Sequence, residues 1–239
     1  MLCKWEQLPK ELQIPEVRPY YDILKKKQWS LLLKRCFDIV VSAVMLLLVS
    51  PIFLILAVAI KLDSPGPVFF RQVRVTQYGK RFRIFKFRSM VQDADKGSQV
   101  TVGADSRITR VGKFIRKSRL DEVCQLIDVL RGTMTFVGTR PEVPRYVDCY
   151  APEMMATLLL PAGVTSVASI CYKDEDKLLN AAEDVDAVYT QKVLPGKMRY
   201  NLKMIREFSF WQDIRIMFMT VFAVLGMRVD MDAEIPAEK

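Results

Sequence analysis

Two adjacent carboxylates, Asp121 and Glu122, stand directly after a run of cationic side chains. Arg116, Lys117 and Arg119 are the cations just before them. Nearby positive charge favours the ionised form of a carboxyl group, so the sequence predicts a lowered pKa for Asp121. An ionised carboxylate can attack phosphorus and form an acyl phosphate. The spacing therefore makes Asp121 a candidate nucleophile for phosphoryl transfer.

The same residues also fit a purely structural interpretation. A helix over 119–131 would end at Gly132, and Ser118 with Asp121 would form a capping box at its start. Consecutive residues of a helix point about 100° apart. Asp121 and Glu122 would then not share one task. If Asp121 attacks, Glu122 is left to orient a partner or to hold a metal ion.

Candidate phosphate-binding cations come from three segments. Lys86 and Arg88 lie in the sequence KFRSM, Arg116 precedes the carboxylates, and Arg140 lies in the turn-rich sequence FVGTRPE. Arginine guanidinium groups match phosphate oxygens in bidentate fashion. Each cluster taken singly is more typical of a solvated basic surface, and Arg88 and Arg140 also fit structural pairing with carboxylates. Together they indicate a site for phosphate groups.

Composition narrows the chemistry further. Residues 61–120 contain 15 Lys or Arg and 4 Asp or Glu, a net charge of +11, whereas the whole chain carries +9. The partner of this segment is therefore expected to be anionic. The chain contains no histidine, which excludes Ser–His and Cys–His catalysis and histidine-ligated metals. Its five cysteines form no CxxC pair, which argues against a disulfide framework or a zinc ribbon.

A long apolar segment precedes this basic region. Residues 39–60 carry no charge over 22 positions, and about 20 helical residues cross the hydrocarbon core of a bilayer. Ser50-Pro51 interrupts the segment, and basic residues flank both of its ends, which therefore prefer the same, cytoplasmic side. A re-entrant helix-break-helix over 31–62 satisfies both features. An ordinary kinked span fits too, because prolines are tolerated in membrane helices.

The remaining pattern predicts an α+β fold that is mostly helical. Residues 68–87 are rich in β-branched and aromatic side chains around a turn at Tyr78-Gly79, which favours a β-hairpin with a basic face. The apolar residues 208–227 favour an amphipathic helix at the membrane interface, although a buried core helix fits equally well. The predicted organisation is an interfacial or loosely ordered N-terminal preface (1–30), the membrane hairpin (31–62), a catalytic domain (63–227) and a C-terminal tail (228–239).

Several motifs in this order resemble those of a known family, the bacterial sugar transferases or monotopic phosphoglycosyl transferases. The resemblance is close over about residues 30–145 and looser beyond. The motifs are Lys34-Arg35-x-Phe37-Asp38, Ser50-Pro51, SPGPVFFRQ at 64–72, KFRSM at 86–90, Arg116-x-x-x-Leu120-Asp121-Glu122-x-x-Gln125-Leu126, and Phe136-Val-Gly-x-Arg-Pro141.

The resemblance implies a function. Such enzymes move a sugar-1-phosphate from a nucleoside-diphosphate sugar, with a UDP-sugar the favoured donor, to a polyprenol phosphate. By resemblance, Asp121 is the nucleophile that forms a phosphosugar intermediate, and Glu122 assists as a Mg²⁺ ligand or hydrogen-bonding partner. The enzyme would lie monotopically on the cytoplasmic face of the bacterial inner membrane, anchored by a helix broken at Ser50 and Pro51. It would perform the first membrane step in the synthesis of capsule, exopolysaccharide, O-antigen or glycoprotein glycan.

Departures from the family pattern keep alternatives open. Val123-Cys124 replaces the usual Leu-Pro, Thr139 replaces a proline, and Leu160 stands where an arginine is usual. A membrane-tethered module that binds anionic ligands, or an inactive scaffold of the same fold, is therefore a second interpretation. Nucleic acid is not expected as a partner, because the chain has no recognised nucleic-acid motif. A homodimer is left open.

Overall fold

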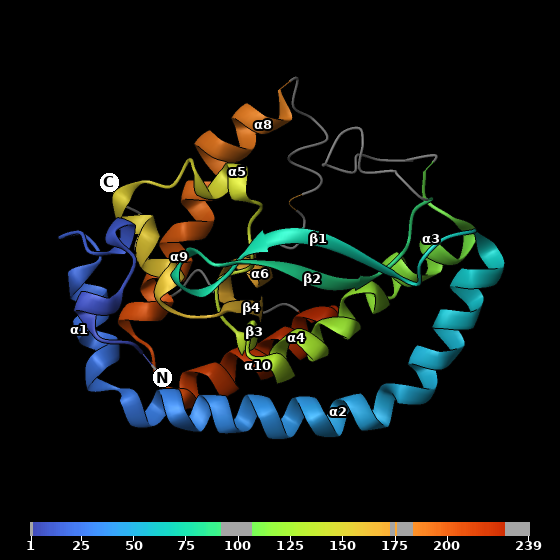
Figure 1. Ribbon diagram of the computed structural model, residues 1–239, viewed down its shortest axis with the longest axis horizontal. Coiled ribbons are helices and arrows are strands. Elements are labelled where there is room, and N and C mark those ends of the chain that lie inside the picture. Colours follow the sequence, from blue (N-terminus) through green and yellow to red (C-terminus); the bar gives the residue numbers. More distant parts are fainter. Residues whose placement is uncertain (1, 92–106, 173–174, 176–183, 228–239) are drawn as a thin grey trace.

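The computed structural model describes residues 2–91, 107–172, 175 and 184–227. These residues are mostly helical, with two small sheets (Figure 1). The predicted tail 228–239 lies outside them. The helices, 3-10 turns and strands are η1 (Trp5–Gln7), η2 (Lys10–Leu12), α1 (Arg18–Lys26), α2 (Gln28–Asp63), β1 (Phe69–Val75), η3 (Gln77–Gly79), β2 (Arg81–Phe87), α3 (Arg110–Lys117), η5 (Leu120–Gln125), α4 (Leu126–Arg131), β3 (Met134–Val137), α5 (Pro144–Val147), η6 (Pro152–Leu159), β4 (Ala162–Thr165), α6 (Val167–Cys171), α8 (Val185–Val188), the π-helical η7 (Tyr189–Val193), α9 (Leu194–Arg206) and α10 (Phe210–Val224).

The apolar segment forms part of α2, a single helix of 36 residues that bends partway along its length (Figure 1). Pro51 lies inside this helix. Because proline has no N–H, the carbonyl of Leu47, four residues earlier, lacks the donor it would have in a regular helix. The hydroxyl of Ser50 donates to that carbonyl at 2.8 Å. The sequence-predicted break is therefore a bend within one continuous helix.

Two apolar helices expose their hydrophobic side chains. By length and composition, α2 could cross a membrane. Helix α10 lies beside the first half of α2 (Figure 1), and the rings of Phe37 and Phe210 pack at 5.8 Å. Large apolar side chains are exposed on both, among them Trp29, Leu47, Leu48, Leu54, Ile55 and Leu62 on α2 and Trp211, Phe218, Val221, Phe222 and Val224 on α10. Such an extended exposed apolar surface is typical of a protein that contacts a membrane.

A buried polar clamp joins α2 to the rest of the molecule. The ammonium group of Lys34 lies 2.5 Å from Oδ2 of Asp213 on α10 and donates to the carbonyl of Val137 at 2.7 Å. One turn further along α2, Asp38 accepts a hydrogen bond from the hydroxyl of Thr135 at 2.7 Å. Lys34, Asp38 and Asp213 are all nearly inaccessible to solvent. The motif around Lys34 therefore fixes α2 against β3 and α10.

The N-terminal preface is part of the main hydrophobic core. Leu12, Tyr21 and Leu24 are almost fully buried and pack in one cluster with Leu159 of η6 and Ile205 of α9. The described part of residues 1–30 is therefore well packed. The interpretation of this preface as loosely ordered, one of the two drawn from the sequence, is wrong for these residues. Composition alone hides this, because several partners of these side chains, such as Leu159 and Ile205, lie far away in the sequence.

The predicted β-hairpin is confirmed. Strands β1 and β2 pair antiparallel with Phe70 opposite Lys86 and Arg74 opposite Phe82, so Arg74 and Lys86 share one face. The turn contains Tyr78, whose φ of 59° is in the left-handed region. The hydroxyl of Tyr78 accepts a hydrogen bond from the backbone N–H of Cys3 at 3.0 Å. The preface thus holds the turn of the hairpin that carries the candidate cations.

Candidate active site

The adjacent carboxylates lie at the start of η5, directly after a sharp reversal of the chain. Ser118 follows the last turn of α3, and its hydroxyl donates to the carbonyl of Phe114 at 2.7 Å. Arg119 has a φ of 56°, which turns the backbone into η5. The predicted capping box is therefore wrong, because Ser118 closes the preceding helix. The helix predicted over 119–131 is η5 followed by α4, and it ends as predicted at Gly132, whose φ is 82°.

Glu122 is held between two cations. Arg140 donates to both of its oxygens, with the NH1 nitrogen 3.3 Å from Oε2 and the NH2 nitrogen bonded to Oε1. The ammonium group of Lys86 lies 3.4 Å from Oε1. Burial alone would raise the pKa of Glu122, but the positive charges of Arg140 and Lys86 outweigh burial and hold this pKa well below its ordinary value. Glu122 is thus a permanently ionised carboxylate that fixes two of the predicted phosphate-binding residues.

Asp121 has a different environment from its neighbour. Burial raises the pKa of Asp121, the negative charge of Glu122 raises it further, and the charges of Lys86 and Arg116 oppose this shift only in part. The lowered pKa predicted from the sequence is therefore wrong, because burial outweighs the nearby cations. No other described residue donates a side-chain hydrogen bond to the Asp121 carboxylate. Asp121 is consequently a more basic carboxylate than usual, and within the described part of the chain its only hydrogen bond comes from its own backbone N–H.

The hairpin contributes a second cation that the sequence analysis did not single out. Arg74 lies on the same face of the hairpin as Lys86, and it donates to the carbonyl of Pro141 at 3.0 Å and to the side-chain oxygen of Gln72 at 2.7 Å. Burial lowers the pKa of Arg74 and also that of Lys86. The residue spacing in the hairpin pattern would have indicated that Arg74 faces the site beside Lys86.

A loop after β3 brings Arg140 to the dyad. The N–H of Gly138 donates to the carbonyl of Thr165 at 2.9 Å, and the N–H of Gly163 donates to the carbonyl of Thr139 at 2.8 Å. A Cβ atom on Gly163 would lie 2.2 Å from the backbone nitrogen of Gly138. Only glycine at position 163 allows β4 to approach this closely. The pairing of β3 with β4 therefore fixes the backbone from which Arg140 projects.

A buried ionic network lies behind this loop, and the sequence analysis missed it. Glu142 accepts a hydrogen bond from the hydroxyl of Tyr189 at 2.6 Å and lies 3.7 Å from the ammonium group of Lys197. Lys197 also lies 3.0 Å from Glu175. Burial, and then the charge of Glu142, raise the pKa of Tyr189, which stays a hydrogen-bond donor. These residues come from distant segments, and nothing in their local sequence indicates the network.

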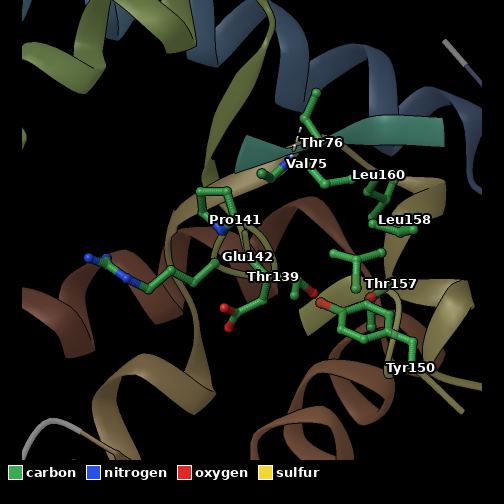
Figure 2. Close-up of a pocket in the computed structure, with 12 residues that line it drawn as sticks. Val75, Thr76, Thr139, Pro141, Glu142, Tyr150, Thr157, Leu158 and Leu160 are labelled. Atoms are coloured by element: carbon green, nitrogen blue, oxygen red, sulfur yellow. Dashed lines mark hydrogen bonds between the residues drawn. The ribbon is translucent and has the colours of Figure 1, made fainter. Parts of the chain in front are cut away.

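A small cavity lies within the same part of the loop. It measures about 10 Å³, room for about one water molecule. Figure 2 shows that Thr139, Glu142 and Tyr150 project to the same side of the loop. Leu160 also lines the cavity. Leu160 replaces the arginine that is usual in the resembled family, so here an apolar side chain closes this wall.

The other predicted site residues have different positions. Arg116 lies in the last turn of α3, where its charge acts on Asp121. Arg88 is buried and donates to the carbonyls of Pro65 at 2.9 Å and Ser64 at 2.7 Å. These contacts fix the turn after α2 and favour a structural role for Arg88. Ser50 and Pro51 lie at mid-length in α2, as described above. The site therefore brings together Asp121, Glu122, Lys86, Arg116 and Arg140.

Two carboxylates are available for a divalent cation. Among residues 2–91, 107–172, 175 and 184–227, no three His, Cys, Asp or Glu side chains gather into a metal site. Mg²⁺, however, is usually bound through one or two carboxylates together with substrate phosphates. No described side chain donates a hydrogen bond to the Asp121 carboxylate. Oε1 of Glu122 already accepts from both Arg140 and Lys86, whereas Oε2 accepts only from Arg140 and keeps one lone pair for a cation. The dyad therefore fits a Mg²⁺ ion held jointly with a phosphate-bearing substrate.

Comparison with known proteins gives a family that agrees with this geometry. The model of the bacterial sugar transferase family matches residues 29–227, which include every residue of the site. The chain belongs to the bacterial sugar transferase family. Residues 1–28, which supply part of the main core, lie outside the matched region.

Relatives with known names are sugar transferases of this family. The chain is 39% identical over 196 residues to the UDP-glucose:undecaprenyl-phosphate glucose-1-phosphate transferase of Escherichia coli (strain K12), which covers 80% of this chain and 40% of the relative. It is 38% identical over 197 residues to the UDP-N-acetylgalactosamine-undecaprenyl-phosphate N-acetylgalactosaminephosphotransferase of Aeromonas hydrophila, covering 81% of this chain and 44% of the relative. The chain thus spans less than half the length of these two curated relatives.

Proposed function

We propose that the protein transfers a sugar-1-phosphate from a nucleoside-diphosphate sugar to a polyprenol phosphate. One observation carries the proposal: a more basic Asp121 carboxylate, to which no described side chain donates a hydrogen bond, lies next to a Glu122 that is fixed between two cations. The names of the relatives support a UDP-sugar as donor and undecaprenyl phosphate as acceptor. They differ in the sugar, so the sugar transferred by this chain is not assigned.

The first half of the reaction uses Asp121 as the nucleophile. Its carboxylate oxygen attacks the sugar-linked phosphorus of the donor, the bond from this phosphorus to the bridging oxygen breaks, and a nucleoside monophosphate leaves with the electron pair. The product on the enzyme is an acyl phosphate that carries the sugar. The raised pKa of Asp121 supports this role, since a more basic carboxylate is a better nucleophile once it is ionised.

The second half of the reaction regenerates the free carboxylate of Asp121. A phosphate oxygen of the polyprenol phosphate attacks the same phosphorus, the bond between that phosphorus and Asp121 breaks, and a polyprenyl-diphosphate sugar leaves. The cations Lys86, Arg116 and Arg140 are placed to neutralise phosphate oxygens in both halves. Glu122 orients Arg140 and Lys86 through the bonds described above.

Mg²⁺ is proposed as the cofactor, with Glu122 as its protein ligand and the phosphates of the donor as its other ligands. When bound, the ion would neutralise charge on the donor phosphates and favour departure of the nucleoside monophosphate. The lone pairs on the carboxylates of Asp121 and Glu122 support this assignment.

The membrane arrangement is proposed to be monotopic, on the cytoplasmic face of the bacterial inner membrane. The bend in α2 (Figure 1), the presence of Pro51 inside this helix, basic residues at both ends of its apolar part, and the exposed apolar side chains of α10 support it. In this arrangement α2 enters and leaves one leaflet, and α10 lies in the interface beside it. The site then lies where a lipid-borne phosphate meets a soluble donor.

A donor panel tests the proposed function. The protein in nanodiscs is incubated with undecaprenyl phosphate, MgCl₂ and single UDP-, GDP- or TDP-sugars, and release of the nucleoside monophosphate is measured. We expect release with at least one donor, dependence on the lipid acceptor for turnover, and loss of release with EDTA. Mass spectrometry without the acceptor should find one phosphosugar on Asp121. The absence of release with every donor would refute the proposal.

A further inference from the structure

Gln125 carries a buried amide that has no hydrogen-bond partner among the described residues. Its side chain is 1% exposed, and both Nε2 and Oε1 are without a partner. A buried polar group without a partner loses the hydrogen bonds it would make with water, which destabilises the fold. Such a cost is typical of residues retained for a ligand rather than for stability.

The position of Gln125 connects it to the dyad. It is the last residue of η5, and residues three apart in a 3-10 helix lie on the same side. Glu122, three residues earlier, contacts Lys86 of β2, and Asp128, three residues later, accepts a hydrogen bond from the N–H of Phe85 of β2 at 2.8 Å. Gln125 therefore lies one turn beyond Glu122, on the side of the helix that faces the hairpin.

We infer that Gln125 is a binding residue of the active site, whose amide donates to and accepts from a hydroxyl-type group held beside Glu122. The chemistry of the amide selects the class of ligand. A phosphate oxygen only accepts hydrogen bonds and would leave Oε1 unpaired, whereas a hydroxyl or a water molecule can satisfy both Nε2 and Oε1. The group is therefore a hydroxyl of the donor sugar or a water molecule that binds together with the donor. This inference rests on the proposed transfer reaction.

Gln125→Met tests it, because methionine has a similar size and no amide. Without substrate, we expect the melting temperature to rise by about 2–4 °C, since an unpartnered buried amide is removed. With substrate, we expect kcat/KM for monophosphate release to fall at least tenfold. Gln77→Met is the matched control. Its Nε2 donates to the carbonyl of Leu159 at 2.9 Å, so this change should lower the melting temperature and leave kcat/KM within about twofold.

Donors that lack single sugar hydroxyls separate the two sources of the group. If Gln125 binds a sugar hydroxyl, one deoxy donor should react equally well with the wild type and with Gln125→Met. If it binds a water molecule, Gln125→Met should lower kcat/KM by the same factor with every donor. Full activity of Gln125→Met, or a fall in its melting temperature like that of Gln77→Met, would overturn the inference. A wild-type protein without any monophosphate release would instead refute the transfer reaction itself.

Discussion

Asp121 and Glu122 are neighbours in the sequence, but their surroundings shift the pKa values of the two carboxyl groups in opposite directions. The pKa of Asp121 is raised by burial and by the charge of Glu122. The pKa of Glu122 is lowered by Arg140 and Lys86 despite its burial. One carboxylate is thus left reactive and the other is fixed, and the two substitutions to the neutral amide should have opposite effects on stability.

Asp121→Asn should abolish transfer without loss of stability. A raised pKa in the folded state means that the neutral form stabilises the protein below the unfolded pKa, and that this contribution is lost as the pH rises through the folded pKa. At neutral pH the neutral asparagine should therefore leave the melting temperature unchanged or higher. Monophosphate release should fall by about 10³-fold or more. Thermal unfolding and release assays measure both, with Asp148→Asn on the exposed end of α5 as the control. A fully active Asp121→Asn would remove Asp121 from the mechanism.

Glu122→Gln should destabilise the protein at neutral pH by about 1–3 kcal/mol, because Arg140 and Lys86 lose their charged partner. A lowered folded-state pKa gives stability that is present above the unfolded value, ordinarily near 4.5, and lost as the pH falls through the folded pKa. Urea unfolding between pH 3 and pH 7 should show a smaller acid-dependent loss in the variant. Glu207→Gln, at an exposed pair with Lys203, should change stability by less than about 0.5 kcal/mol. Equal effects of both changes would contradict the role given to Glu122.

The clamp between Lys34 and Asp213 should show strong coupling. Either Lys34→Met or Asp213→Leu alone should cost about 3–5 kcal/mol, because the remaining charge is buried without a partner. The double variant should be more stable than either single one. Unfolding free energies from a double-mutant cycle measure the coupling. The exposed pair Arg18 and Asp22 serves as the control and should couple by only about 0.3–0.5 kcal/mol. Simple additivity at Lys34 and Asp213 would show that the clamp is absent.

Pro51→Ala should straighten α2, because alanine restores the N–H and removes the ring clash. In a cysteine-free background, single cysteines at the exposed positions 28 and 61 should be shielded from a membrane-impermeant outer reagent in wild type, since the proposed monotopic arrangement puts both ends on the cytoplasmic side. In Pro51→Ala, the outer reagent should label the cysteine at one of these two ends in a fraction of the molecules. Ser50→Ala should weaken the bend through the Leu47 carbonyl, which has no N–H donor at Pro51. Ser42→Ala should not, because the Ile39 carbonyl that Ser42 contacts has the N–H of Ala43 four residues later. Outer labelling of either end in wild type would show a spanning helix.

Leu24→Ala in the preface should destabilise the catalytic part by about 2–5 kcal/mol, since Leu24 is fully buried against the main core. Lys25→Ala, at an exposed neighbouring position, should have little effect. Unfolding followed by the fluorescence of the tryptophans measures the difference. A small effect of Leu24→Ala would mean that the preface does not contribute to the core.

The sequence predicted local features of the fold and the site better than long-range ones. The hairpin with its turn at Tyr78-Gly79 and the end of a helix at Gly132 follow from local residue patterns, and both are confirmed. Likewise Lys86 and Arg140 were recognised as cations near the dyad. That they converge on one carboxylate depends on strand pairing and a loop that meet only in three dimensions.

Burial, which is not visible in a local pattern, explains the wrong prediction for the pKa of Asp121. The pKa of Asp121 was predicted from the charges around it, but desolvation raises it. The phosphate-binding role predicted for Arg88 stays a prediction, while its two terminal nitrogens donate to the backbone carbonyls of Pro65 and Ser64, directly after α2. Arg74 was overlooked, although the spacing within the predicted hairpin puts it on the same face as Lys86.

The contact of Cys3 with the hairpin turn matters for building chimeric sugar transferases. The family match begins at residue 29, which would be the obvious junction for exchanging catalytic parts between members. A junction there would remove the buried side chains of α1 and the N–H that holds Tyr78. Exchanges that keep residues 2–27 together with the hairpin should therefore yield folded chimeras more often than exchanges that separate them.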